Sequence, residues 1–474
     1  MRGRQWWTGA AAAVAAALLP VTAPVAVAEP AGTTAPVDWR SCGDGLTCAE
    51  VTVPADWRDR RAGTTEVALV RIPAVDQAHK LGPLLVNLGG PTATLGWFRQ
   101  SAAKFAELTQ WFDVIAFDPR GFGESTGVTC PTSPPDLLFL AADPAGRWAE
   151  QTRQGQRYDR TCRDVMGNLA GRLDSGQVAH DMDAIRQALG QRTLSYYGNS
   201  YGTVYGQAYL ELFPHRVNRM YLDSVLDHTT VAPYDRYAVT AAVVRDRLPG
   251  VTEWCSAHPE CALHGQDVLA VWDRVLAKAS RAPIPALGTD WVMTAGELRA
   301  RSGAMSEASA PHFTAALAKA DAGDAIGFHA IPEQTPPDLS FHAYCADFPA
   351  LRRQEALPLM AELKKIEPRV GWLHPATVQG RCLGLPAPSN PPHDLRVPAA
   401  LPPVLLANGL HDVATTPSMG QHVAAQLPGA RWLGVDGQHA LYFTGDNRCL
   451  RDHVHRYLTT GALPAADTIC PAES

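Results

Sequence analysis

Two serines in this chain have the glycine spacing of a nucleophile held on a tight turn. Ser200 lies in "YGNSYG" and Ser125 in "GESTG", and both stretches match Gly-x-Ser-x-Gly. The pattern presents a serine hydroxyl between a strand and a helix, where it can attack a carbonyl carbon. Only Ser200 has these surroundings, because the β-prone "TLSYY" precedes it and the helix-like "YGTVYGQAYLELF" follows it. A Pro-rich stretch follows Ser125, so we predict that Ser200 is the nucleophile.

A serine hydroxyl needs a base that accepts its proton, and the base needs an acid that orients it. In this architecture the acid and then the histidine follow the serine along the chain, each after a late strand. Asp412 in "NGLHDVATTP" and His439 in "DGQHALYF" stand at those places. His411 precedes the acid along the chain, so it is the weaker candidate for the base. Asp436 is only three residues before His439 and more naturally stabilises the turn there, so it is the weaker candidate for the acid. We therefore predict a triad of Ser200, Asp412 and His439.

The reaction also needs N–H groups that stabilise the developing oxyanion. The backbone N–H of Tyr201, directly after the nucleophile, is one candidate. The second should come from the loop after an early strand, where "NLGGPTATLG" contains Gly89 and Gly90. A Gly-Gly-Pro sequence can serve simply to reverse the chain. Because this one follows a predicted strand of the same sheet, we predict that the Gly90 amide is the second donor.

The elements that must position these residues alternate between strands and helices. Six short apolar runs predict buried strands: "GPLLVNLGG", "WFDVIAFDPRG", "RTLSYYGNS", "RVNRMYLDS", "PVLLANGLHD" and "ARWLGVDGQH". Helix-like segments lie between or after them, near 181–189, 202–212, 418–426 and 447–458. Buried strands that alternate with helices predict an α/β fold with a mostly parallel sheet.

The pattern of the sequence changes between about residues 226 and 400. Helix-like stretches such as "GQDVLAVWDRVLAKAS" and "PHFTAALAKADAG" alternate there with Pro-rich joints. We interpret this segment as a helical domain inserted into the sheet domain. The polar stretch 137–160 remains unassigned.

The N-terminal residues 1–28 have the features of a secretory signal peptide. Arg2 and Arg4 precede an apolar run, and "AVA" at 26–28 provides small residues for cleavage. We therefore expect a secreted, extracellular protein without a membrane segment in its mature form. Acidic residues outnumber basic ones, 47 to 41, which gives no basic surface for nucleic acid.

Ten cysteines in an exported chain favour disulfides over metal sites, because no neighbouring couple has the C-x-x-C spacing of a zinc site. Spacing alone does not establish connectivity. Proximity along the chain suggests the pairs Cys42–Cys48, Cys130–Cys162, Cys255–Cys261, Cys345–Cys382 and Cys449–Cys470.

Taken together, these motifs resemble the alpha/beta-hydrolase superfamily. Within it, the chain is most similar to secreted tripeptidyl aminopeptidase-like serine peptidases, relatives of prolyl aminopeptidases. The likeness is carried by "CGDGLTCAEVTVPADW", "NLGGP", "FDPRGFGES", "YGNSYGT", "CADF", "NGLHDVATTP", "DGQHA" and "CLRDHVHRYLTTGALPAADTIC".

The resemblance implies an alpha/beta-hydrolase core over 29–225 and 401–474, with a helical cap over 226–400. It also implies that Asp118 and Arg120 in "DPRGFG" are structural. Two features depart from the family pattern: Thr92, Ala93 and Thr94 replace the usual glycines, and the acid loop has one extra residue before its proline.

The resemblance implies a serine exopeptidase that releases short peptides from free N-termini and needs neither a cofactor nor a metal. An exopeptidase needs a carboxylate for the substrate ammonium, and we name Asp347 in "YCADF" as the candidate, with a solvated helix-cap aspartate as the alternative. A secreted esterase or amidase acting on a small acyl compound would use the same triad. A non-catalytic binding protein on the same scaffold is the third hypothesis.

Overall fold

The computed structural model describes residues 36–135, 143–230, 232–302, 305, 309–329, 339–373, 380 and 382–473. The predicted signal peptide therefore lies outside the described residues, and its assignment remains a prediction.

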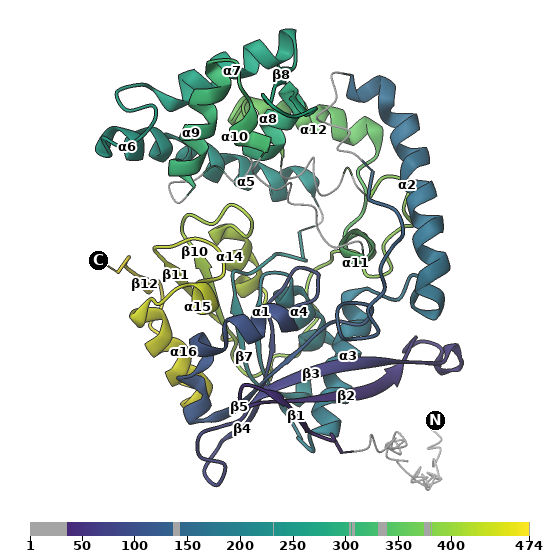
Figure 1. The fold of residues 1–474 in the computed structure, drawn as a ribbon. Coiled ribbons are helices and arrows are strands. Elements are labelled where there is room, and N and C mark those ends of the chain that lie inside the picture. The colour runs from purple at the N-terminus through teal and green to yellow at the C-terminus, as the bar shows by residue number, and fades with distance from the viewer. Residues whose placement is uncertain are drawn as a thin grey trace, which may run out of the picture.

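A ten-stranded sheet forms the centre of the lower part of the molecule (Figure 1). Its strand order is β1-β2-β3-β5-β4-β6-β7-β10-β11-β12, and all pairings from β5 to β12 are parallel. The pairings among β1, β2, β3 and β5 are antiparallel. The strands are β1 (Arg40–Gly43), β2 (Leu46–Pro54), β3 (Thr64–Ile72), β4 (Gly82–Asn87), β5 (Phe112–Phe117), β6 (Leu194–Asn199), β7 (Val217–Asp223), β10 (Leu405–Gly409), β11 (Arg431–Val435) and β12 (Ile469–Cys470).

All six predicted strands are present, as β4, β5, β6, β7, β10 and β11. Strands β4, β5, β6 and β10 are mostly buried along their whole length, as expected for parallel strands covered on both faces, whereas β7 and β11 each have partly exposed residues near their start. The sheet helices are α1 (Leu95–Gln100), α3 (Ser175–Ala188), α4 (Gly202–Leu212), α14 (Pro417–Ala425), α15 (Leu441–Thr444) and α16 (Arg448–Thr460). Apolar residues of α3, α4 and α14 pack on one face of the sheet, and those of α1, α15 and α16 pack on the other.

A second group of helices lies above the sheet in Figure 1 and has its own apolar core. Its members come from the chain between β7 and β10. They are α5 (Pro233–Arg247), α6 (Pro249–Ala257), α7 (Val268–Arg281), α8 (Ala295–Ser302), α9 (Ala310–Asp321), α10 (Ile326–His329) and α12 (Arg353–Ile366), with a small hairpin of β8 (Ile284–Pro285) and β9 (Val292–Met293). The two helix-like stretches predicted in this segment are α7 and α9. We call this group the cap helices.

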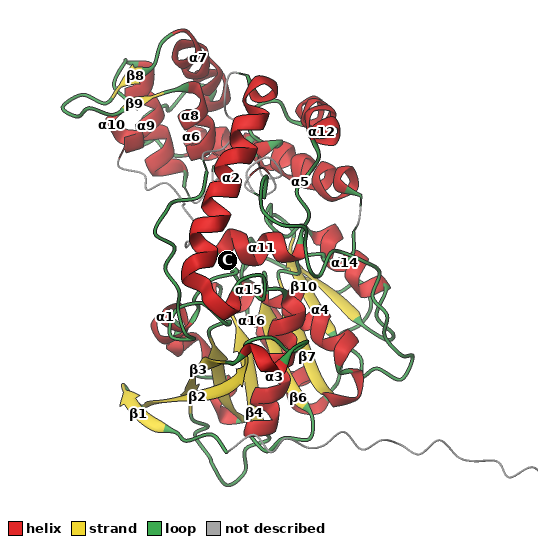
Figure 2. Ribbon diagram, turned by 90° about the vertical axis from the view of Figure 1, so that its right-hand side faces the viewer, coloured by secondary structure: helices red, strands yellow, loops and turns green. Residues whose placement is uncertain are grey.

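Two further helices connect the sheet domain with the cap helices. The stretch left unassigned in the sequence, 137–160, contains most of α2 (Pro144–Met166), which extends between the sheet domain and the cap helices (Figure 2). Helix α11 (Ser340–Asp347) belongs to the inserted segment but lies against α3 of the sheet domain. The inserted segment thus contacts the sheet domain as well as forming the cap helices.

The five expected cysteine pairs all lie at disulfide distance, with Sγ–Sγ separations of 1.90–2.07 Å. The cysteine pairing predicted from proximity along the chain is therefore confirmed. Within the described residues, none of the helices has the length and apolar character needed to cross a membrane.

Candidate active site

Ser200 occupies the turn between strand β6 and helix α4. Its φ is +51°, in the left-handed region that non-glycine residues rarely adopt. The two glycines of the motif allow the turn, because a Cβ on Gly198 would lie 2.6 Å from the carbonyl oxygen of Gly202. A Cβ on Gly202 would lie 2.6 Å from the carbonyl oxygen of Asn87. The local geometry is therefore that of a nucleophile elbow.

Ser125 has a different environment from Ser200. Its side chain is fully buried, and its hydroxyl donates to the carbonyl oxygen of Asp118 at 2.7 Å. The hydroxyl oxygen of Ser125 also accepts the backbone N–H of Ala68 at 2.7 Å. Ser125 thus joins the turn after β5 to strand β3, which is a structural role.

Asp412 and His439 come together from loops that follow adjacent strands, β10 and β11. Nδ1 of His439 lies 2.7 Å from Oδ2 of Asp412. Asp412 is 2% exposed, and its other oxygen, Oδ1, accepts the backbone N–H groups of Ala414 and Thr415 at 2.8 and 3.0 Å. The Thr415 hydroxyl donates to Oδ2 at 2.6 Å. This arrangement can fix one imidazole tautomer, so that Nε2 is the free basic nitrogen.

The sequence analysis did not identify Thr415 as a residue of the site. An aspartate followed by hydroxyl residues two to four positions later is typical of an Asx-type turn. The "DVATT" stretch contains that signal, although the signal alone does not identify a partner for the carboxylate.

The two rival residues pair with each other. Nε2 of His411 lies 2.8 Å from Oδ1 of Asp436, and both side chains are more than two-fifths exposed. This surface pair leaves Asp412 as the acid that contacts His439.

The pair of Asp412 and His439 shifts the titration of both groups. Burial alone would lower the pKa of His439, but the Asp412 carboxylate outweighs it and raises that pKa above its usual value. Burial would raise the pKa of Asp412, but His439 and the hydrogen bonds from Thr415 hold it below its usual value. A carboxylate that stays ionised beside the ring stabilises the imidazolium that forms when the base accepts a proton.

Asp223 and Ser224, at the end of β7, join the nucleophile turn to the histidine loop. The carbonyl oxygen of Asp223 accepts the N–H of Ser200 at 2.9 Å. Its fully buried carboxylate accepts the N–H groups of Leu441 and Tyr442 at 3.1 and 2.9 Å. The Ser224 hydroxyl accepts the N–H of Ala440, the residue after His439, at 2.9 Å.

Two adjacent residues therefore hold Ser200 and the segment after His439 to the same strand end. Sequence reasoning missed them, although an Asp-Ser pair that ends a buried apolar strand in "RVNRMYLDS" was a visible signal.

The Gly-Gly-Pro loop after β4 lies directly against the nucleophile. A Cβ on Gly89 would lie 2.8 Å from Cβ of Ser200 and 3.1 Å from N of Tyr201. The N–H of Gly89 donates to Oδ1 of Asn87 at 3.0 Å, whereas the N–H groups of Gly90 and Tyr201 donate to no other residue within the described parts of the chain. The unpaired N–H groups thus belong to the residue after Gly89 and to the residue after Ser200, and donors of this kind are what an oxyanion site needs.

The "DPRGFG" turn supports this loop. Oδ1 of Asp118 accepts the N–H groups of Thr94 and Leu95 at 2.5 and 2.9 Å, at the end of the loop that lacks the usual glycines. The fully buried guanidinium of Arg120 donates to both carboxylate oxygens of Asp181 and to the carbonyl oxygens of Pro54 and Ala55. The contacts of both side chains are thus structural.

Asp347, the candidate ammonium anchor, is enclosed at the end of α11. It is 0% exposed, and its carboxylate accepts the hydroxyl of Tyr201 at 2.7 Å. It also accepts the N–H and hydroxyl of Ser175 at 3.0 and 2.7 Å. Burial and the nearby Asp174 carboxylate raise the pKa of Asp347 to about 7. The carboxylate is thus enclosed and hydrogen-bonded to the sheet domain and to the nucleophile turn, and its role as an ammonium anchor stays a prediction.

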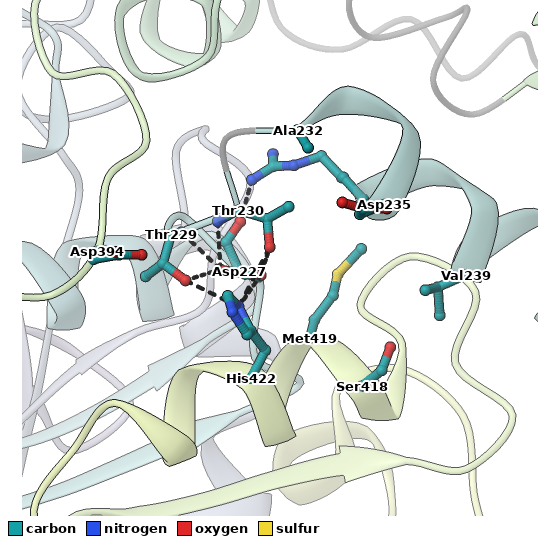
Figure 3. Close-up of a pocket in the computed structure, with 11 residues that line it drawn as sticks. Asp227, Thr229, Thr230, Ala232, Asp235, Val239, Asp394, Ser418, Met419 and His422 are labelled. Atoms are coloured by element: carbon teal, nitrogen blue, oxygen red, sulfur yellow. Dashed lines mark hydrogen bonds and ion pairs between the residues drawn. The ribbon is translucent and has the colours of Figure 1, made fainter. Parts of the chain in front are cut away.

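A cavity of about 420 Å³ lies between the loop after β7, helix α5 and helix α14 (Figure 3). Its most buried acid, Asp227, accepts the N–H and hydroxyl of Thr229 and lies 2.9 Å from Nδ1 of His422. The hydroxyl of Thr230 donates to the same carboxylate. These bonds hold the start of the inserted segment against α14. The carboxylate of Asp227 therefore stabilises the wall of the cavity.

Comparisons with known proteins agree with this geometry. A family model described as alpha/beta hydrolase fold matches residues 82–446. Serine protease Hip1 of Mycobacterium tuberculosis is 28% identical over 482 residues, which cover 92% of this chain and 91% of that protein. Tripeptidyl aminopeptidase of Streptomyces coelicolor is 26% identical over 493 residues, covering 94% and 88%. Carboxylesterase B of Mycobacterium tuberculosis is 30% identical over 479 residues, covering 91% and 89%.

These matches confirm the resemblance to serine peptidases of the tripeptidyl aminopeptidase type that the motifs indicated. Together with the mostly parallel sheet and the pairing of Asp412 with His439, they define the class of the protein. The chain belongs to the alpha/beta hydrolase family and is a serine hydrolase.

Proposed function

We propose that this serine hydrolase is a secreted exopeptidase that releases short peptides from free N-termini through an acyl-enzyme on Ser200. The observation that carries the catalytic part is the contact of 2.7 Å between His439 and Asp412, on a loop tied to the same strand end as the Ser200 turn. The peptidase part is supported by the similarity to tripeptidyl aminopeptidases over 94% of the chain.

In the proposed reaction, Oγ of Ser200 attacks the scissile carbonyl carbon while Nε2 of His439 accepts the hydroxyl proton. The carbonyl oxygen becomes an oxyanion and accepts hydrogen bonds from the N–H groups of Gly90 and Tyr201. His439 then gives its proton to the leaving amine, and the C–N bond breaks. A water molecule attacks the acyl-enzyme in the same way and restores the Ser200 hydroxyl.

Two features support an exopeptidase that works outside the cell. The cap helices lie over the end of the sheet where β7 leads into α5, and a covered site favours short or terminal substrates (Figure 1). Five disulfides and the features of residues 1–28 suit an oxidising compartment reached by export.

An esterase or amidase is the second candidate, and one observation favours it. The carboxylate expected to receive a peptide ammonium is enclosed, as described for Asp347. The similarity to carboxylesterase B, over 91% of the chain, agrees with an acyl substrate that carries no amine.

A comparison of three substrates decides between the two candidates. The purified protein is given a tripeptide amide with a free amine, the same compound with an acetylated amine, and a small aryl ester. An exopeptidase cleaves the first compound with a kcat/KM at least about tenfold above the second, because only the first offers an ammonium to bind. Equal rates on the two peptides with faster turnover of the ester would establish the esterase. Ser200→Ala should remove all three activities.

A further inference from the structure

Helix α11 contacts both loops that bear the unpaired N–H groups beside Ser200, although it belongs to the inserted segment. At its first residue, the hydroxyl of Ser340 donates to the carbonyl oxygen of Pro91 at 2.7 Å. Pro91 directly follows Gly90, whose N–H is one of the two oxyanion donors proposed above. The beginning of α11 therefore holds the Gly-Gly-Pro loop.

At its last residue, α11 holds the other loop. The carboxylate of Asp347 accepts the hydroxyl of Tyr201, and the backbone N–H of Tyr201 is the second proposed oxyanion donor. Tyr201 is 1% exposed and Asp347 is 0% exposed, so water does not compete for this bond. The aromatic rings of Tyr205, Tyr344 and Phe348 surround the Tyr201 ring at centroid distances of 5.4, 6.0 and 6.3 Å.

The helix between these two contacts is short and well fixed. Seven residue steps at 1.5 Å per residue place its ends about 10 Å apart. Its Asp347 end is anchored to the sheet domain through Ser175, at the start of α3. Cys345 joins the helix to Cys382 by a disulfide, and the N–H of Asn390 donates to the carbonyl oxygen of Ala346 at 3.0 Å.

We propose that α11 is a strut that sets the separation of the two oxyanion donors, with Ser340 and Asp347 as positioning residues. Ser340 acts through Pro91 on the N–H of Gly90, and Asp347 acts through the Tyr201 side chain on the N–H of that residue. This inference rests on the roles proposed above for Ser200, Gly90 and Tyr201. The positioning role differs from a role of Asp347 in amine binding, because it affects the oxyanion, which peptide and ester substrates both form.

The strut has a kinetic signature. An oxyanion exists only as the carbonyl is attacked, so a displaced donor weakens the transition state more than the bound substrate. Loss of a strut contact should therefore lower kcat and leave KM nearly unchanged. The loss should be equal for a free-amine peptide and for a neutral ester, since both pass through the same tetrahedral species.

The test uses Tyr201→Phe, Ser340→Ala and Asp347→Asn in the full-length protein. Tyr201→Phe removes only the hydroxyl that reaches Asp347 and keeps the ring. Tyr209→Phe is its matched control, because the hydroxyl of this buried tyrosine on α4 also donates to a buried aspartate, Asp183 at 3.2 Å. Each variant is titrated with a fluorophosphonate for active sites and assayed with the aryl ester and the free-amine tripeptide amide.

We expect Tyr201→Phe and Ser340→Ala each to lower kcat about tenfold on both substrates, less than the 10²–10³ lost when a donor is removed outright. The rate of fluorophosphonate labelling should fall in parallel, KM should stay within about twofold, and Tyr209→Phe should match the wild type. Tyr201→Phe combined with Asp347→Asn should be no slower than the slower single variant, because both changes act on the same hydrogen bond.

Other results overturn the inference and separate it from the proposed function. Unchanged kcat in Tyr201→Phe and Ser340→Ala, with labelling still lost in Ser200→Ala, refutes the strut and leaves the proposed function intact. A loss in Asp347→Asn that is confined to the free-amine peptide makes Asp347 an amine anchor instead. Turnover and labelling that persist in Ser200→Ala refute the proposed function itself. If Asp347→Asn does not fold, Tyr201→Phe and Ser340→Ala still test the role of α11.

Discussion

Replacing Gly89 by alanine tests whether the Gly-Gly-Pro loop is part of the catalytic site. The added methyl group would lie 2.7 Å from the carbonyl oxygen of Asn199, 2.8 Å from Cβ of Ser200 and 3.1 Å from N of Tyr201. Non-bonded carbon atoms normally approach to about 3.5–4.0 Å, so the loop or the serine turn must move by about 1 Å. Both are held by hydrogen bonds, from Gly89 to Asn87 and from Ser200 to Asp223.

A displacement of about 1 Å in a catalytic group can cost about 10²-fold in rate. We therefore expect Gly89→Ala to lower kcat for an aryl ester about 100-fold, which corresponds to about 2.7 kcal/mol of transition-state stabilisation. The active-site concentration is titrated first, and kcat and KM are then measured together with the melting temperature.

Gly323→Ala provides the control. Gly323 has the same φ of +97° as Gly89, but a Cβ there would meet no atom within 4 Å. Both variants thus carry the same strain in φ, and only one carries the contact with Ser200. A kcat in Gly89→Ala within about threefold of that in Gly323→Ala would refute the placement of this loop at the oxyanion.

Three further predictions concern the triad and its support. Ser200→Ala should abolish fluorophosphonate labelling and turnover, whereas Ser125→Ala should keep most activity; labelling lost only in Ser125→Ala would reverse the assignment. His439 must be neutral to accept a proton, and Asp412 raises its pKa, so kcat/KM for a neutral ester should fall as the pH drops through a value above 6.5; a profile flat to about pH 4 would contradict a histidine base. Asp223→Ala should lower the free energy of unfolding by at least about 2 kcal/mol and also lower kcat, because two buried N–H groups lose their acceptor; urea unfolding and steady-state kinetics measure both, and an unchanged kcat would show that Asp223 does not position the histidine loop.

The sequence alone determined the features that depend on local pattern. Short apolar runs bounded by turn residues predicted the six strands around the site, because strands covered on both faces of a parallel sheet are mostly apolar. The Gly-x-Ser-x-Gly spacing, together with the strand before it and the helix after it, selected the turn at Ser200, where only small neighbours fit the left-handed backbone. Chain order and strand ends were enough to select Asp412 and His439, which the structure places in contact.

Tertiary structure alone decided what each polar side chain faces. The sequence left Asp347 as either an ammonium anchor or a solvated helix-cap aspartate, and only the structure shows that α11 turns back onto the sheet domain and buries it against Tyr201 and Ser175. Asp223 was not selected from the sequence, yet it reaches residues 441 and 442, more than two hundred positions later. Such contacts join segments that are remote along the chain, and the short-range spacing of residue types carries no information about which remote groups will meet.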